Sequence, residues 1–167
     1  MFARVYMQIS ANIANNTFMA TVQLGKQANE NDQVTAQFRD NAGVQVFRMN
    51  TRHNTVYEDF DTIINWVPNF WYCVEIEMKA ASGGYGTLDG EARMWVDGVL
   101  GTSSVNRNFG NADIDRFRVG TMWNNINTTI DIFTDCAAAG DARIGCAVDV
   151  RGGYNLVSPA IAAFFIQ

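Results

Sequence analysis

A β-hairpin is predicted by the segment Ala92–Leu100, which has the sequence Ala-Arg-Met-Trp-Val-Asp-Gly-Val-Leu. Side chains alternate between two faces along its first half, so Arg93 and Trp95 share one face. The Asp97-Gly98 pair that follows can adopt positive φ at both positions, as a two-residue hairpin turn requires. If Met94 and Val96, which alternate with Trp95, face the core, then Arg93 and Trp95 lie together on an outer surface.

The same period of two recurs along the chain and predicts eight strands. Polar connectors separate these strands, and only Asp59–Ile64 is predicted to form a short helical turn. This pattern indicates an all-β fold in which two antiparallel sheets pack as a sandwich. The predicted strands are Arg4–Ile9, Phe18–Leu24, Val34–Arg39, Val44–Met49, Trp71–Lys79, Ala92–Val96, Asp115–Gly120 and Thr129–Cys136.

The composition is that of one globular domain. The chain has 167 residues, of which 48% are hydrophobic and 17% are charged, and its formal net charge is -5. An acidic surface repels phosphate groups, which argues against nucleic acid as a partner. No apolar run reaches the length of a membrane span. The sequence starts directly in a predicted strand without a leader, so we expect a virion component or a piece of a larger secreted protein.

Several predicted strands carry motifs that occur together in a fixed order. They are Phe2–Met7, Trp71–Glu75, Arg93–Gly98, Arg116–Gly120 and Ile132–Asp135, followed by Arg143–Cys146. In this order they resemble the concanavalin A-like lectin/glucanase superfamily, in particular its laminin-G-like domains, over residues 2–146. The resemblance implies a jelly-roll sandwich with one concave and one convex sheet. Such domains often bind glycans or mediate adhesion on secreted enzymes, cell surfaces and phage particles.

The three cysteines allow one disulfide and one free thiol, and their spacing alone leaves the pairing open. The resemblance implies that Cys73 pairs with Cys146. Cys136 falls where the family pattern has an aliphatic residue, which predicts a buried free thiol. The usual Asp-Asp pair of the pattern is Thr134-Asp135 here, which weakens any calcium role carried over from it.

The chain is divided into a sandwich at residues 1–146 and an apolar tail at residues 147–167. The run Ala160–Ile166 is too apolar to remain exposed in a soluble monomer. The family usually has a further strand before the one matching Phe2–Met7. We therefore expect the tail to fill the vacant edge, either within one chain or by donation between the subunits of a homo-oligomer.

Three features could carry chemistry, and each has a structural alternative. Glu75 and Glu77 share one face of a predicted strand, as catalytic carboxylates of a glycoside hydrolase would, but the motif is incomplete and a solvated polar face is favoured. The single histidine, His53, is expected at the surface. Loops rich in Asp and Asn could hold calcium but are also ordinary turn formers. We therefore predict neither a catalytic site nor a metal or other cofactor.

Aromatic and amide side chains near strand ends are the candidates for recognition. Trp and Tyr rings stack on the apolar faces of sugars, while Asn and Arg bond their hydroxyl groups. The alternative for each ring is ordinary packing. The predicted ligand-binding residues are Trp95, Arg93, Trp123, Asn124, Asn125 and Tyr85.

Together these features favour a non-catalytic carbohydrate-binding or adhesion domain, extracellular or on a virion surface, with a glycan as partner. The first alternative is a structural, self-associating module such as a virion or extracellular-filament subunit. The second is a glycoside hydrolase that uses Glu75 and Glu77.

Overall fold

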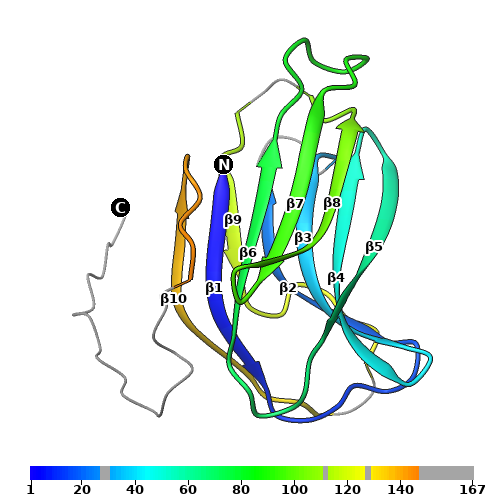
Figure 1. Ribbon diagram of the computed structural model, residues 1–167. Coiled ribbons are helices and arrows are strands. Elements are labelled where there is room, and N and C mark those ends of the chain that lie inside the picture. The colour runs from blue at the N-terminus through cyan, green and yellow to red at the C-terminus, as the bar shows by residue number, and fades with distance from the viewer. Residues whose placement is uncertain (27–30, 111–112, 127–128, 147–167) are drawn as a thin grey trace.

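Two antiparallel five-stranded sheets face one another in the computed structural model (Figure 1). The structure describes residues 1–26, 31–110, 113–126 and 129–146, and over these residues it contains strands and no helix. The predicted all-β sandwich is therefore confirmed. The strands are β1 (Phe2–Ile9), β2 (Phe18–Gly25), β3 (Gln33–Asn41), β4 (Val44–His53), β5 (Val56–Asn65), β6 (Tyr72–Lys79), β7 (Gly90–Val96), β8 (Val99–Arg107), β9 (Arg116–Val119) and β10 (Ile132–Gly140).

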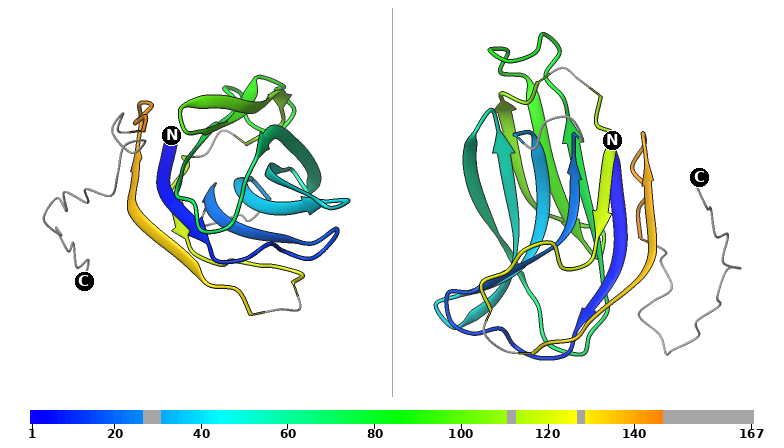
Figure 2. Two further views of the ribbon diagram at one scale, coloured as in Figure 1. Left: turned by 60° about the horizontal axis from the view of Figure 1, so that its bottom comes forward. Right: turned by 180° about the vertical axis from the view of Figure 1, so that it is seen from behind.

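The order of strands defines two layers. The first sheet has the order β10-β1-β6-β7-β8, and the second sheet has the order β5-β4-β3-β2-β9. The two further views in Figure 2 show the two sheets lying face to face. Each sheet therefore has an inner face toward the core and an outer face, and successive residues of a strand alternate between the two.

Alternate side chains of both sheets fill the space between them. β1 buries every second residue from Ala3 to Ile9. The aromatic part of the core surrounds Phe38, whose ring centre lies 5.2 Å from that of Phe47 and 5.1 Å from that of Trp66. Burying one such side chain contributes roughly 1.5–3 kcal/mol to stability. The apolar residues that recur with a period of two in the sequence are thus the inward-facing residues of each strand.

The sequence pattern predicts the wrong element for one segment. Asp59–Ile64, predicted as a helical turn, belongs to strand β5. In the ladder between β4 and β5, Asp61 lies opposite Arg48 and Asp59 lies opposite Asn50. These partners lie on a neighbouring strand. Pairing with that strand outweighs the local preference of the segment for a turn.

The predicted hairpin at Asp97-Gly98 is present, with φ angles of 51° and 81° at the two turn residues. Its second strand, β8, extends to Arg107, well beyond the two residues that the sequence indicated. β8 lies at the edge of the first sheet, and most of its residues are exposed or half-buried. An edge strand of this kind needs no apolar alternation, which is why the sequence pattern ended early.

Strand β10 pairs with β1 and forms the other edge of the first sheet. The edge beside β1, which the sequence analysis left for the tail, is therefore taken by residues 132–140. Residues 147–167 lie outside the described residues, so the packing of the apolar tail and the domain division at residue 146 stay predictions.

Cys136 is a free, exposed thiol, and the prediction of a buried one is wrong. In the β1–β10 ladder, Tyr6 faces Asp135 and Arg4 faces Ala138, so two residues of β10 oppose one residue of β1. Cys136 is in this bulge and has a φ of 50°. A bulge re-aims the side chain and breaks the alternation that the sequence argument assumed.

Candidate functional site

The outer face of the second sheet carries a groove of about 490 Å³. It crosses strands β2 to β5 and continues onto the segment after β9. Most of its lining is polar, although it lies over the middle of a sheet. The groove is lined by Phe18, Gln37, Arg39, Arg48, Asn50, Tyr57, Asp59, Trp123 and Asn125.

Cross-strand register explains how these side chains come together. The residues of β3, β4 and β5 that point outward pair directly with one another, because all three strands are antiparallel and in register. They form three successive polar rows, which are Gln33–Arg52–Tyr57, Thr35–Asn50–Asp59 and Gln37–Arg48–Asp61. A face built in this way rests on paired strands rather than on loops.

An ion-pair network occupies the middle of the groove. Arg48 donates to the Asp59 carboxylate over 2.6 Å and also to Asp61, with one bond of 3.1 Å. The amide of Asn50 donates to the other oxygen of Asp59 over 2.7 Å. Arg39 lies 3.9 Å from Asp61. Both aspartates are thus held by cations, and such charge-assisted bonds fix the geometry of the network.

Arg52 and Tyr57 stand apart from this network, side by side in the first row, where Tyr57 lines the groove and Arg52 lies next to it on β4. The Arg52 guanidinium lies 4.8 Å from the centre of the Tyr57 ring. Arg52 forms no ion pair with any described residue, and its buried Nε has no hydrogen-bond partner among them. Tyr57 is 59% exposed. A cation without a carboxylate therefore lies beside a phenol that solvent and ligand can reach.

The charges of this face differ in sign from the charge of the whole chain. Among the residues that line the groove, Arg39 and Arg48 stand against Asp59, so one positive charge is in excess, on a chain whose formal net charge is -5. Low-dielectric surroundings strengthen the field of such a charge in a cleft. The groove is therefore suited to a ligand with negative charges.

The opposite end of the groove is aromatic. Phe18 lies opposite Arg39, beyond the last polar row, and Trp123 and Asn125 come from the segment after β9. This segment is attached to β2 by backbone bonds, from Ala20 N–H to the Trp123 carbonyl over 3.0 Å and from Met122 N–H to the Ala20 carbonyl over 3.1 Å. The Asn125 side chain accepts from Phe18 N–H over 2.7 Å.

The six predicted ligand residues lie in different parts of the molecule. Trp123 and Asn125 line the groove, and Asn124 is between them, in a bridge to Met19. Tyr85 is in a loop outside the groove, where its hydroxyl donates to Asp32 over 2.6 Å. Their roles in binding stay predictions.

Trp95 and Arg93 are on the outer face of the first sheet, on the other side of the molecule. Trp95 faces outward as predicted but is only 8% exposed. The Arg143 guanidinium lies 4.6 Å from its ring centre, and the Phe2 ring lies 6.2 Å from it. Arg93 donates to Glu77 over 2.8 Å. The sequence could not reveal this cover, since Arg143 is far from Trp95 along the chain.

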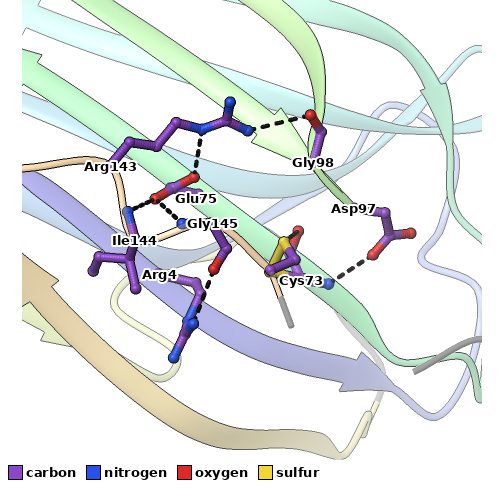
Figure 3. The surroundings of a disulfide bond; sticks show 9 residues. Arg4, Cys73, Glu75, Asp97, Gly98, Arg143, Ile144 and Gly145 are labelled. Carbon is purple, nitrogen blue, oxygen red and sulfur yellow. Dashed lines mark hydrogen bonds and ion pairs between the residues drawn. A yellow bond between two sulfur atoms is a disulfide. The ribbon is translucent and has the colours of Figure 1, made fainter. Parts of the chain in front are cut away.

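Glu75 anchors the C-terminal segment of the described chain and has no exposed surface (Figure 3). Its carboxylate accepts from Ile144 N–H over 2.7 Å, from Gly145 N–H over 3.0 Å and from Arg143 Nε over 3.0 Å. A carboxylate closed off by three donors cannot serve as nucleophile or general acid. Glu75 is therefore unavailable to the alternative of a glycoside hydrolase. The favoured expectation of a solvated polar face is also wrong, since both Glu75 and Glu77 are buried.

The disulfide between Cys73 and Cys146, which the resemblance implied, lies beside this anchor (Figure 3). Together the disulfide and Glu75 hold residues 143–146 across β6. Disulfides are typical of proteins that fold in an oxidising compartment, which is consistent with an extracellular protein. None of the described residues forms a helix long and apolar enough to cross a membrane.

His53 is buried, contrary to the prediction of a surface position. Its Nε2 lies 2.9 Å from Glu58, and its ring packs edge-on against Phe109. It faces the interior, away from the groove. Within the part of the chain that the structure describes, no group of three or more His, Cys, Asp or Glu side chains could hold a metal ion.

The sequence does contain a signal for the groove. Outward positions of three consecutive strands are polar at nearly every step, and they include Arg39, Arg48 and Arg52. A sheet face needs no such density of arginine for solubility. Recognising the groove from the sequence requires the position of β5, part of which the sequence predicts as a helical turn.

Comparisons with known proteins give a fold and no family. Neither protein-family models nor curated protein sequences produced a match. Among solved structures, a mutant of alginate lyase Aly36B in complex with alginate trisaccharide is 12% identical with a TM-score of 0.55, over 81% of this chain and 68% of that one. A second mutant, with alginate tetrasaccharide, is 13% identical with a TM-score of 0.53, over 81% and 67%.

The structure of Aly36B itself is 12% identical with a TM-score of 0.51, and the match covers 84% of this chain and 60% of that chain. At this identity the likeness establishes the shared β-sandwich and is compatible with the concanavalin A-like class. It does not identify a laminin-G-like domain.

These neighbours contradict the predictions of a non-catalytic binding domain and of no enzyme. The solved structures that share the fold are named as alginate lyases, which are polysaccharide-degrading enzymes. The prediction of no enzyme rested on the incomplete paired-acid motif at Glu75 and Glu77, which bears on glycoside hydrolysis alone. A carbohydrate remains the kind of partner to which the fold points.

Proposed function

We propose that the chain is a polysaccharide lyase that cleaves a uronic-acid polymer by β-elimination in the groove of the second sheet. The observation that carries the proposal is the position of Arg52, a cation without a carboxylate partner, beside the accessible phenol of Tyr57. The shared fold with alginate lyases supports it.

Elimination makes two demands on an active site. A uronate sugar carries a carboxylate on C5, and its C5 proton is only weakly acidic because the carboxylate is already negative. A cation held against the carboxylate stabilises the additional charge that develops when the proton leaves. The planar guanidinium of Arg52 can bind both carboxylate oxygens. Arg52 therefore supplies the neutralising charge.

The second demand is a group that moves protons. Among the described residues that line the groove, only Tyr57 has a titratable oxygen outside the ion-pair network. As phenolate, Tyr57 takes the C5 proton; the C4–O bond breaks, and a C4–C5 double bond forms. The phenol then returns the proton to the departing glycosidic oxygen. No water is consumed, and the tyrosine ends in its starting state.

The remaining groove residues bind and orient the chain. Arg48 is fixed by Asp59 and Asp61, so it presents a preorganised surface for sugar hydroxyl groups. Asn50 and Gln37 add amide donors and acceptors within the same rows. We expect preorganisation of this kind to orient the C5 proton toward Tyr57.

The proposal is tested by incubating the protein with a polyuronate such as alginate and following the ultraviolet absorbance of the unsaturated product. Tyr57→Phe should lower kcat by about 10²–10⁴-fold, and Arg52→Ala by about 10²–10³-fold. Tyr6→Phe and Lys79→Ala, both on the first sheet, are the matched controls and should act as wild type. Absence of unsaturated product from the wild-type protein, or full activity of Tyr57→Phe, would contradict the proposal.

An extracellular site of action fits both the disulfide and a polymeric substrate. Location on a virion surface and self-association through residues 147–167 stay predictions. Sedimentation of the full chain over a range of concentrations would test the second of these directly.

A further inference from the structure

The two ends of the groove have different chemistry. Tyr57 and Arg52 lie in the first polar row, on β5 and β4. Phe18 and Trp123 lie at the far end, on β2 and on the segment attached to it. Charge dominates the first end, and aromatic rings dominate the second.

These ends are too far apart to hold the same sugar. In β3, Gln33 belongs to the row of Tyr57, and Arg39 lies opposite Phe18. Six residues of strand separate these positions, which is about 20 Å. Trp123 is bonded to Ala20, opposite Gln37, and so lies about 13 Å along the strands from the row of Tyr57. β5 and β2 are also separated by two strands, with spacings that add up to about 14 Å across the sheet. Several sugar units of a polysaccharide fit between the two ends.

The aromatic end is rigid. Trp123 is held by the bonds that join its segment to Ala20, and Asn125 is held to Phe18 by its backbone N–H and by its side chain. Since the backbone that carries the ring is already fixed, stacking of a ligand orders only the side chain and costs less conformational entropy. Pyranose rings have apolar faces that match such a surface, with polar edges for a neighbouring amide.

We propose that Phe18, Trp123 and Asn125 form a distal subsite, which binds the ring face of a sugar several units away from the cleaved bond. The inference rests on the proposed function for the identity of the chain that is bound. The distal subsite adds affinity only for oligosaccharides long enough to reach it. It thereby sets the preferred length of the substrate, while Arg52 and Tyr57 act on chains of every length.

The test is calorimetric binding of alginate oligosaccharides of graded length to the wild-type chain and to Trp123→Ala, Trp123→Phe and Arg52→Ala. In the wild type, affinity should rise in a step once the oligosaccharide spans the groove. Trp123→Ala should remove this step, a loss of about tenfold for long chains and none for short ones. Trp123→Phe should keep most of the step, and Arg52→Ala should weaken binding at every length.

Two results would overturn the inference, and they differ from one another. If Trp123→Ala weakens short and long chains equally, or neither, there is no distal subsite although the groove binds uronates. If the wild type binds no alginate oligosaccharide of any length, the proposed function fails and the subsite fails with it.

Discussion

Removal of the Cys73–Cys146 disulfide should lower the free energy of unfolding by about 4 kcal/mol. The two cysteines are 73 residues apart, and closing a loop of this length lowers the entropy of the unfolded chain by about 15 cal/mol/K. In the folded state the same segment is also held by Glu75, which accepts from Ile144, Gly145 and Arg143. The folded structure should therefore survive, and the loss should arise mainly in the unfolded state.

The measurement is urea unfolding of the Cys73→Ser/Cys146→Ser double variant against the wild type, both without reductant. Cys136→Ser is the control, because this exposed thiol is free and its removal should leave stability nearly unchanged. Domains of this size have a total stability of about 5–15 kcal/mol, so the double variant should still fold at room temperature. A loss below about 1 kcal/mol would refute the reasoning.

Three further outcomes follow from the structure. Glu75→Ala should cost about 3 kcal/mol of stability, because it leaves two backbone N–H groups without their acceptor, and a thermal melt measures this. Asp59→Asn should partly free Arg48, tighten polyuronate binding and make that binding more sensitive to salt in a titration at rising ionic strength. Partial burial and the neighbouring Asp135 raise the pKa of the Cys136 thiol, so less thiolate is present at any given pH. Alkylation of Cys136 should be slower at neutral pH than that of a free cysteine peptide and should rise at higher pH.

The sandwich could be predicted from the sequence because burying one face of a strand imposes a period of two that survives without any knowledge of partners. The Asp97-Gly98 turn could be predicted for a similar reason, since its chemistry is local. Strand β5 could not, because its outward acids Asp59 and Asp61 gain their stabilisation from Arg48 on β4 and Arg39 on β3. Cys136 was misjudged because a bulge shifts the alternation by one residue.

The site was harder to predict than the fold. Burial of Trp95 depends on Arg143, and closure of Glu75 depends on backbone groups of a distant segment. Contacts of this kind leave no periodic trace in the sequence. The polar rows of the groove do leave one, as alternating arginine and amide residues, but their meaning depends on strand register.

The central claim is that the groove cleaves a uronic-acid polymer by elimination rather than by hydrolysis. The most direct measurement is mass spectrometry of the products formed from alginate in water enriched in heavy oxygen. The account predicts that each cleavage yields one product with an unsaturated non-reducing end, lighter by one water than its hydrolysis counterpart, and one product with an ordinary reducing end. Neither product gains heavy oxygen from the cleavage. Incorporation of heavy oxygen at that bond, or an uncleaved polymer, would contradict it.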